Sequence, residues 1–188
     1  MSPSAQIPTG QAGHADRLAQ WLEDEARVRQ TVQSRSGIAS PEQVRGLTGL
    51  QVMQAMLAGD LPPPPIAETL DFGLISVAHG EAVFQGRPLR RHYNPLGGVH
   101  GGWFATLLDS ALGCAVHTAL PAGRGYTTLE FKVNLVRGLS DQVPLVRAIG
   151  KVVHVGKQVA TAEADLLGHD GRLYAHASTT CLVFELPA

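Results

Sequence analysis

The chain has little cysteine and no long apolar run. Its 188 residues include two cysteines, Cys114 and Cys181, which lie far apart inside apolar stretches. They lack the close spacing of a zinc site and the density of a disulfide scaffold, so we expect two buried free thiols in a reducing cytoplasm. No stretch approaches the roughly eighteen apolar residues of a membrane span. The N-terminus also lacks a charged segment followed by an apolar run, so we expect no signal peptide.

Charge is sparse and balanced. The formal net charge is -1, charged residues make up 16% of the chain, and no block of like charges occurs. Nucleic-acid-binding proteins usually carry a basic patch, so we expect no nucleic-acid partner. The hydrophobic share of 44% suits one globular domain with an added N-terminal segment. The histidines other than His100 share no metal-ligand spacing, so we expect no metal.

From the sequence we expect an N-terminal extension, mostly helical, over residues 1–60 and the main domain over residues 61–188. Residues 1–13 are small and polar, and we expect them to be mobile. From His14 to about Arg27, apolar residues recur on one helical face. The residues that follow either continue this helix or form a short strand.

A second helix is predicted to begin after Ser40, which can cap it, with Pro41 at the first helical position and Gly59 at its end. Four consecutive prolines, residues 62–65, follow. Proline is excluded from the interior of a helix and from a central strand, so we expect residues 61–70 to form a stiff extended connection.

The main domain combines strand-like segments with one long helix. Two short strands are predicted around a turn at His79-Gly80. A continuous apolar stripe from Phe104 to Ala119 predicts a single helix that ends at Pro121. Four further strand-like segments follow, joined by glycine-containing turns. The pattern predicts an α+β fold in which a curved antiparallel β-sheet wraps around one long central helix.

The segment NPLGGVHGGWFATLLD, residues 94–109, precedes and opens this helix. Its Asn94, its His100-Gly101-Gly102 triplet and its Asp109, together with the following GYTTLEFKVNLVRGL, resemble the hotdog-fold acyl-CoA thioesterases of the phenylacetyl-CoA (PaaI-type) family. The resemblance extends from about residue 47 to the C-terminus. It implies a homodimer with active sites shared between subunits, commonly assembled into a homotetramer. It also implies an acyl-CoA substrate and no metal or tightly held cofactor.

Thioester hydrolysis needs an activated water and a site for the oxyanion. The unpaired N–H groups at a helix start carry a partial positive charge, so the Gly101-Gly102 turn can donate to the thioester oxygen. Asp109, ionised at neutral pH, can act as general base or as nucleophile, and the residues leave this choice open. It lies about 13 Å along the axis from the start of its own helix. The resemblance implies that Asp109 of one subunit works with Gly101 and Asn94 of the other.

Further site residues complete the hypothesis. The resemblance places Thr128 where a Ser or Thr positions the water or the carboxylate. Asn94 is expected to hold the water or the thioester carbonyl through its amide, and His100 to orient the loop and the helix start. Two other groups are expected to bind substrate: Trp103 and Tyr126, with Phe104, at an apolar acyl pocket, and Arg137 and Lys157 at the phosphates of CoA.

The function predicted is hydrolysis of an aromatic or medium-chain acyl-CoA. One alternative is a hotdog dehydratase or hydratase, which the HYNPLGG segment faintly resembles. The chain lacks the acidic residue of those enzymes at the expected place, and this disfavours that alternative. Another alternative is a non-catalytic acyl-CoA-binding protein of the same fold, against which the presence of Asp109 argues.

Overall fold

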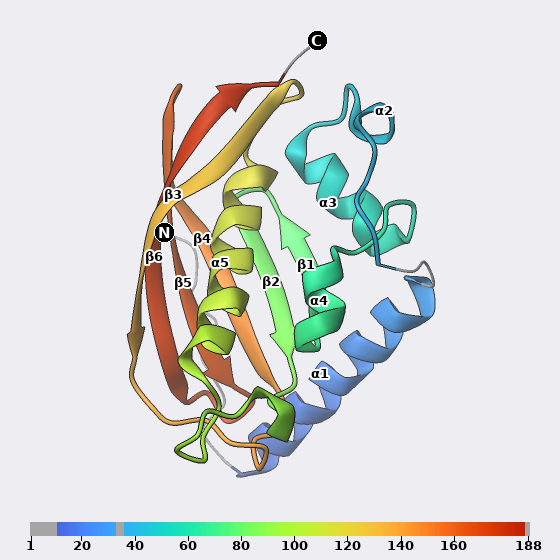
Figure 1. The fold of residues 1–188 in the computed structure, drawn as a ribbon. Coiled ribbons are helices and arrows are strands. Elements are labelled where there is room, and N and C mark those ends of the chain that lie inside the picture. Colours follow the sequence, from blue (N-terminus) through green and yellow to red (C-terminus); the bar gives the residue numbers. More distant parts are fainter. Residues whose placement is uncertain (1–10, 33–35, 187–188) are drawn as a thin grey trace.

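The fold is a single antiparallel β-sheet curved around one helix (Figure 1). The computed structural model describes residues 11–32 and 36–186, so most of the segment expected to be mobile lies outside the described residues. The sheet has six strands in the order β1-β2-β4-β5-β6-β3, all antiparallel to their neighbours. The α+β hotdog architecture expected from the sequence is confirmed. The strands are β1 Phe72–Ala78, β2 Glu81–Gly86, β3 Arg124–Leu135, β4 Val146–Val155, β5 Val159–Gly168 and β6 Leu173–Glu185.

Helix α5, Gly101–Thr118, fills the concave face of the sheet. Its side chains at Leu107, Leu108 and Leu112 are completely buried, because the apolar stripe of the helix meets the alternating inward residues of the strands. On β4, Gly150 allows the closest approach, since a Cβ there would lie 2.2 Å from the carbonyl oxygen of Ala111. A larger residue at this position would push the sheet away from the helix.

Strand β3 forms an edge of the sheet and carries exposed apolar side chains. Leu129 is 58% exposed and Leu135 is 56% exposed, and Phe131 between them is also exposed. Among the described residues of one chain, β3 pairs only with β6, so none of them pairs with its other edge. An unpaired edge with apolar side chains is a surface that proteins normally cover.

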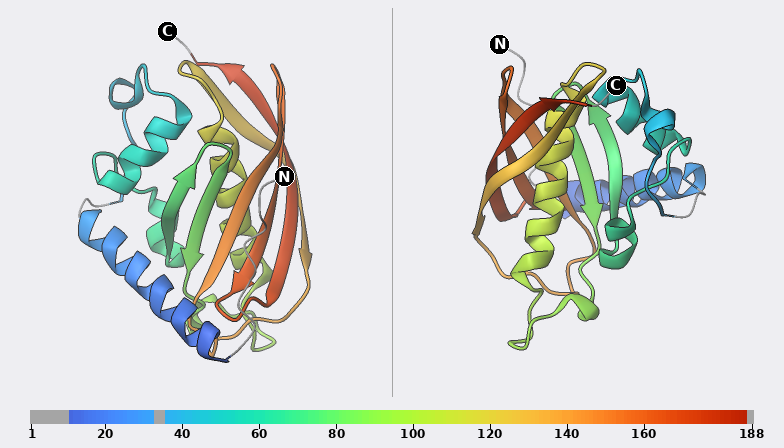
Figure 2. Two further views of the ribbon diagram at one scale, coloured as in Figure 1. Left: turned by 180° about the vertical axis from the view of Figure 1, so that it is seen from behind. Right: turned by 45° about the horizontal axis from the view of Figure 1, so that its top comes forward.

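The N-terminal extension covers the β1 end of the sheet and part of its outer face. Helix α1, Gln11–Thr31, runs across the convex face (Figure 2) and settles the open choice after Arg27 in favour of helix. Its Trp21 is 7% exposed, and the Arg147 guanidinium of β4 lies 4.6 Å from the centre of the Trp21 ring. Arg147 also forms an ion pair of 2.8 Å with Asp24.

Two details of the extension differ from the expectations. The single helix predicted between Ser40 and Gly59 is two helices, because Gly46 adopts a left-handed conformation with φ of 78°. The second of the two restarts at a Thr48 cap. The proline segment is not extended throughout, because Pro65 begins a helix, where its missing N–H costs no hydrogen bond. The helices are α2 Pro41–Val44, α3 Gly49–Ala58 and α4 Pro65–Leu70, and a 3₁₀ turn covers Arg90–His92.

Helix α3 lies directly against α5. The backbone N–H of Gly49 donates to the carbonyl oxygen of Leu120 at 3.1 Å, and a Cβ on Gly49 would lie 1.8 Å from the carbonyl oxygen of His117. Glycine is therefore required at this contact. The boundary drawn at residue 60 stays a prediction, but the extension and the end of α5 are in intimate contact.

Candidate active site

The loop before α5 is folded around the side chain of Asn94. Its Oδ1 accepts hydrogen bonds from the backbone N–H groups of Leu96 at 2.9 Å and Gly98 at 3.3 Å. Because both partners are donors, the oxygen of the amide must point into the loop. The Nδ2 amino group of this half-buried residue is left to donate elsewhere, so Asn94 can contact a substrate as a donor.

The first turn of α5 is capped by His100. The His100 Nδ1 accepts from the backbone N–H of Gly102 at 2.9 Å, and the His100 backbone N–H donates to the carbonyl oxygen of His92 at 2.8 Å. The Gly102 N–H is thus already used, whereas the Gly101 N–H has no hydrogen-bond partner among the described residues. Of the two glycines, Gly101 is the one that can offer a free donor at the positive end of the helix.

Asp109 and Thr128, to which the family resemblance assigns a shared role, lie together. The Thr128 hydroxyl donates to Oδ1 of Asp109 at 3.2 Å, and both side chains are half-buried. The register of β3 against β6 shifts between Thr128 and Glu130, and such a bulge bends a strand and redirects the neighbouring side chains. Asp109 is therefore held by a strand as well as by its own helix.

Two titratable neighbours of Asp109, Cys114 and Tyr126, are neutral at pH 7. Burial raises the pKa of the Cys114 thiol to about 12, opposed by a hydrogen bond with Tyr126 and reinforced by the negative charge of Asp109. Burial also raises the pKa of Tyr126 well above its ordinary value, and the charge of Asp109 adds to this shift. With thiol and phenol both protonated, the Asp109 carboxylate is the base available at this point of the helix.

One chain alone does not bring the base and the helix start together. Asp109 lies eight residues after Gly101, which corresponds to about 12 Å along an α-helix. A single thioester carbonyl is too small to contact both groups at this separation. The two halves of the expected chemistry are therefore built into one chain at separate places.

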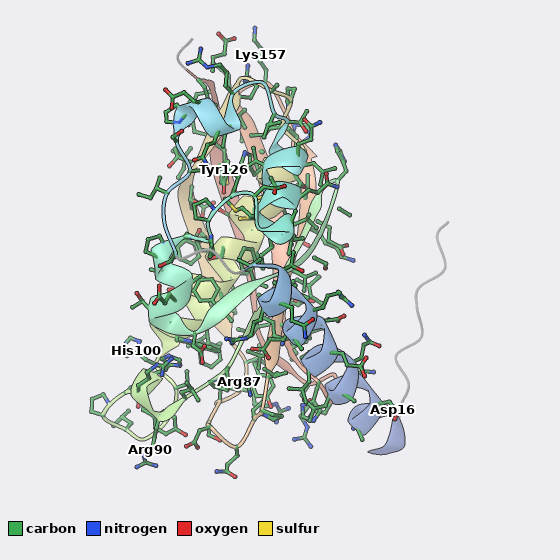
Figure 3. The ribbon with its side chains drawn as sticks, turned by 90° about the vertical axis from the view of Figure 1, so that its right-hand side faces the viewer. Asp16, Arg87, Arg90, His100, Tyr126 and Lys157 are labelled. Atoms are coloured by element: carbon green, nitrogen blue, oxygen red, sulfur yellow. The ribbon has the colours of Figure 1, made fainter. Side chains whose placement is uncertain are left out.

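The remaining predicted residues fall into different environments. Trp103 is 3% exposed, donates from Nε1 to the carbonyl oxygen of Leu70 at 2.9 Å and stacks on His92, so the structure places it in the core. Tyr126 does line a cavity. Lys157 and His100 lie at opposite ends of the molecule (Figure 3), and Arg137 follows the end of β3 that lies near Gly101.

The two cations expected at CoA therefore do not meet within one chain. The Lys157 carbonyl accepts a hydrogen bond from Arg124 at the start of β3, whereas Arg137 follows its end. A strand of 12 residues spans roughly 40 Å. One phosphate group of CoA cannot reach both side chains of the same subunit.

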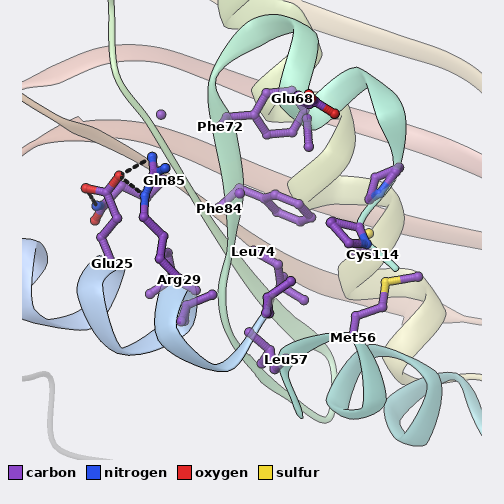
Figure 4. A pocket seen from close by; sticks show the side chains of 18 of the residues that line it. Glu25, Arg29, Met56, Leu57, Glu68, Phe72, Leu74, Phe84, Gln85 and Cys114 are labelled. Atoms are coloured by element: carbon purple, nitrogen blue, oxygen red, sulfur yellow. Dashed lines mark hydrogen bonds and ion pairs between the residues drawn. The ribbon is translucent and has the colours of Figure 1, made fainter. Parts of the chain in front are cut away.

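A cavity of about 830 Å³ lies between the N-terminal extension and the central helix (Figure 4). Its lining includes Cys114 and His117 of α5, Tyr126 of β3 and Met56 of α3. The sequence predicts that the extension, with Trp21 and its methionine-rich helix, either packs across the dimer or covers an acyl pocket, and the cavity lies where the second alternative would place that pocket. The available signal was the methionine-containing apolar face of the second predicted helix, since methionine often lines adaptable apolar surfaces.

Among residues 11–32 and 36–186, no group of three or more His, Cys, Asp or Glu side chains is placed to hold a metal ion. None of the helices in these ranges is long and apolar enough to cross a membrane.

Comparison with known proteins gives matches across the site. Residues 96–175 match the family model of the Thioesterase superfamily. Over 118 residues, covering 63% of this chain and 94% of the relative, the sequence is 25% identical to the 1,4-dihydroxy-2-naphthoyl-CoA hydrolase of Listeria monocytogenes serotype 1/2a (strain 10403S).

Solved structures agree with this match. A phenylacetic acid degradation-related protein from Ralstonia eutropha JMP134 is similar with a TM-score of 0.63 and 27% identity, covering 69% of this chain and 98% of that one. A variant of the phenylacetic acid degradation protein PaaI from Thermus thermophilus has a TM-score of 0.56 and 28% identity, covering 63% of this chain and 97% of that one.

Proposed function

Since the chain carries a Thioesterase superfamily domain over residues 96–175 and is a thioester hydrolase, we propose that it hydrolyses acyl-CoA with an aromatic or medium-chain acyl group. The observation that carries this proposal is the Asp109 carboxylate held by Thr128 at 3.2 Å. Farther along the same helix, Cys114 and His117 line a largely apolar cavity, so an acyl group held there would bring its thioester towards the Asp109 carboxylate, which can activate water.

The proposed active enzyme is a homodimer that completes each site from two chains. The open edge of β3 and its exposed Leu129, Phe131 and Leu135 are suited to antiparallel pairing with a second copy about a two-fold axis. If the axis passes near Phe131, the Thr128 position of one strand lies opposite about residue 134 of the other. Asp109 would then face Gly101 of the partner subunit, whose turn lies against Leu135 of its own chain.

The same pairing would place the phosphate-binding candidates together. Antiparallel strands bring the start of one β3 near the end of the other, so Lys157 of one subunit would approach Arg137 of the partner subunit. This removes the separation found within one chain. We retain both residues as candidates for the phosphates of CoA on this basis.

In the proposed reaction the thioester oxygen accepts hydrogen bonds from the Gly101 N–H and the Asn94 Nδ2 of one subunit. Asp109 of the other subunit removes a proton from water, the water oxygen bonds to the carbonyl carbon, and the C–S bond breaks with CoA leaving as the thiolate. Alternatively, a carboxylate oxygen of Asp109 attacks the carbonyl carbon, the C–S bond breaks with CoA leaving as the thiolate, and water then hydrolyses the mixed anhydride. Both routes need the same arrangement of groups.

A larger assembly is also part of the proposal. On the convex face of the sheet, Val159 and Leu182 are paired neighbours and both are exposed, at 42% and 38%. Helix α1 covers only another part of this face (Figure 2). We propose that this patch joins two dimers into a homotetramer, which analytical ultracentrifugation of the wild type and of a Leu182→Glu variant tests.

The decisive test of the reaction is the Asp109→Asn substitution, with Asp165→Asn on exposed β5 as its matched control. Free thiol release is followed with phenylacetyl-, benzoyl-, hexanoyl- and palmitoyl-CoA. We expect Asp109→Asn to lower kcat by about 10² to 10⁴ with KM nearly unchanged, and the control to keep wild-type rates. Full activity in Asp109→Asn would refute the assignment, and saturable acyl-CoA binding without any turnover by the wild type would indicate a non-catalytic acyl-CoA-binding protein.

A further inference from the structure

The cavity of about 830 Å³ is built by both parts of the chain. One wall belongs to the catalytic domain and includes Leu74 of β1 and Phe84 of β2, and the opposite wall consists of Met53, Met56 and Leu57 of α3 (Figure 4). These facing side chains are apolar. The N-terminal extension therefore supplies half of an apolar chamber that the central sheet and helix alone would leave open.

The inner end of the chamber adjoins the catalytic carboxylate. Tyr126 lines the chamber and lies two residues before Thr128 on the same face of β3, and Thr128 holds Asp109. On α5, a Cβ at Gly113 would lie 2.9 Å from the Tyr126 ring, and Gly113 is one helical turn beyond Asp109. An acyl group whose carbonyl lies at Asp109 therefore needs to extend only about one helical turn to enter the chamber.

The outer end of the chamber is charged. Arg29 of α1 pairs with Glu25 at 2.7 Å and lies 3.8 Å from Asp71, and Arg87 pairs with Glu25 at 2.8 Å. All four residues line this end of the cavity. A hydrocarbon chain gains nothing by entering an ion-pair cluster, so the cluster sets a limit to the length of chain that fits.

We propose that this chamber is the acyl pocket, that it takes a linear acyl chain of medium length, and that Met56 is a specificity-determining residue. This inference rests on the proposed function. The chamber runs from Tyr126 past Leu74 to Arg29, so an aryl group fills only its inner end. A linear chain contacts α3 along its course and stops at the charged cluster. Until that limit, each added methylene raises kcat/KM about fourfold, which corresponds to ~0.8 kcal/mol per buried CH₂.

The test is a chain-length series from acetyl- to palmitoyl-CoA, with phenylacetyl-CoA beside it, for the wild type, Met56→Trp and Gln54→Trp. Gln54 is exposed on the same helix and serves as the matched control. We expect Met56→Trp to keep acetyl- and butyryl-CoA hydrolysis within about twofold and to lose at least tenfold in kcat/KM at the chain length that the wild type prefers. Gln54→Trp should reproduce the wild-type profile.

A Met56→Trp profile equal to that of the wild type would overturn the proposal, as would a wild type that prefers phenylacetyl-CoA to every linear chain. If Met56→Trp does not fold, Met56→Ala replaces it, and its preferred chain should become longer. Binding of non-hydrolysable acyl-CoA thioethers, measured by calorimetry, separates the two proposals. Chain-length-dependent affinity that Met56→Trp abolishes would support the pocket even if no substrate is hydrolysed, which would refute only the proposed function.

Discussion

Thr128→Val removes the hydrogen bond that Thr128 donates to the proposed catalytic carboxylate. Valine has nearly the shape of threonine, so the substitution removes the hydroxyl and keeps the β-branched side chain that suits a strand. The Asp109 Oδ1 then loses its donor at 3.2 Å. Its carboxylate is free to rotate, and its orientation towards the water is no longer fixed.

The expected loss follows from the geometry. A hydrogen bond to a charged group contributes about 1.5–3 kcal/mol, and the contact of 3.2 Å between two half-buried side chains belongs at the lower end. A loss of about 1.5–2 kcal/mol corresponds to a roughly ten- to thirtyfold decrease in kcat. This is smaller than the loss expected for Asp109→Asn, because Thr128 positions the base and does not itself take the proton.

The assay is steady-state thiol release with the best acyl-CoA of the panel, and the matched control is Thr127→Val. Thr127 is the preceding residue of β3 and is exposed on the opposite face. In the double variant Thr128→Val/Asp109→Asn, the loss should be close to that of Asp109→Asn alone, since the two groups act as one unit. A kcat for Thr128→Val within twofold of the wild type, or strictly additive losses in the double variant, would refute the reasoning.

Two further predictions concern buried titratable groups. Burial raises the pKa of Cys114 to about 12 and also raises the pKa of Cys181, so we expect a thiol reagent at pH 8 to modify neither until urea unfolds the chain, and fast labelling of native protein would contradict this. Burial, aided by Arg91, lowers the pKa of His92, so the unfolded chain binds the proton first, and the free energy of unfolding should fall below about pH 6.5. Urea titrations at pH 5 and 7.5 should show a smaller fall in the free energy of unfolding for His92→Asn than for the wild type. Burial also lowers the pKa of His117, so part of the fall should remain in the variant. An equal fall in both proteins would contradict the role of His92.

Most of the fold could be predicted because its signals are local. The apolar stripe of α5 has the helical period, β3 to β6 alternate or run apolar between glycine turns, and each pattern is complete within about fifteen residues. The break at Gly46 and the helix start at Pro65 were not predicted. A glycine costs a helix only about 1 kcal/mol, so the sequence alone does not decide whether the helix continues through Gly46, and the position of α3 against His117 depends on tertiary contact.

The structure brings two of the predicted site residues, Asp109 and Thr128, into contact, while their roles in catalysis stay predictions. The contact between Asp109 and Thr128 joins residues that lie far apart in the sequence. It could be anticipated because the family resemblance supplied the pairing. No spacing rule shows that His100 occupies the Gly102 donor or that Trp103 turns into the core. Side-chain direction is set by packing around each residue, and packing is the information that a single sequence contains least directly.

The cavity gives the N-terminal extension a role that a purely stabilising segment would not need. Trp21 and Asp24 fix α1 to the sheet through Arg147, and Gly49 fixes α3 to the end of α5. Both anchors lie outside the chamber, so they hold its α3 wall in place without filling it. Because α3 is attached to the same helix that carries Asp109, the proposed acyl chain and thioester carbon would be positioned against one rigid element. On this argument, chain length is measured from the catalytic carboxylate itself, which is why a substitution on α3 is expected to change preference without changing the chemistry.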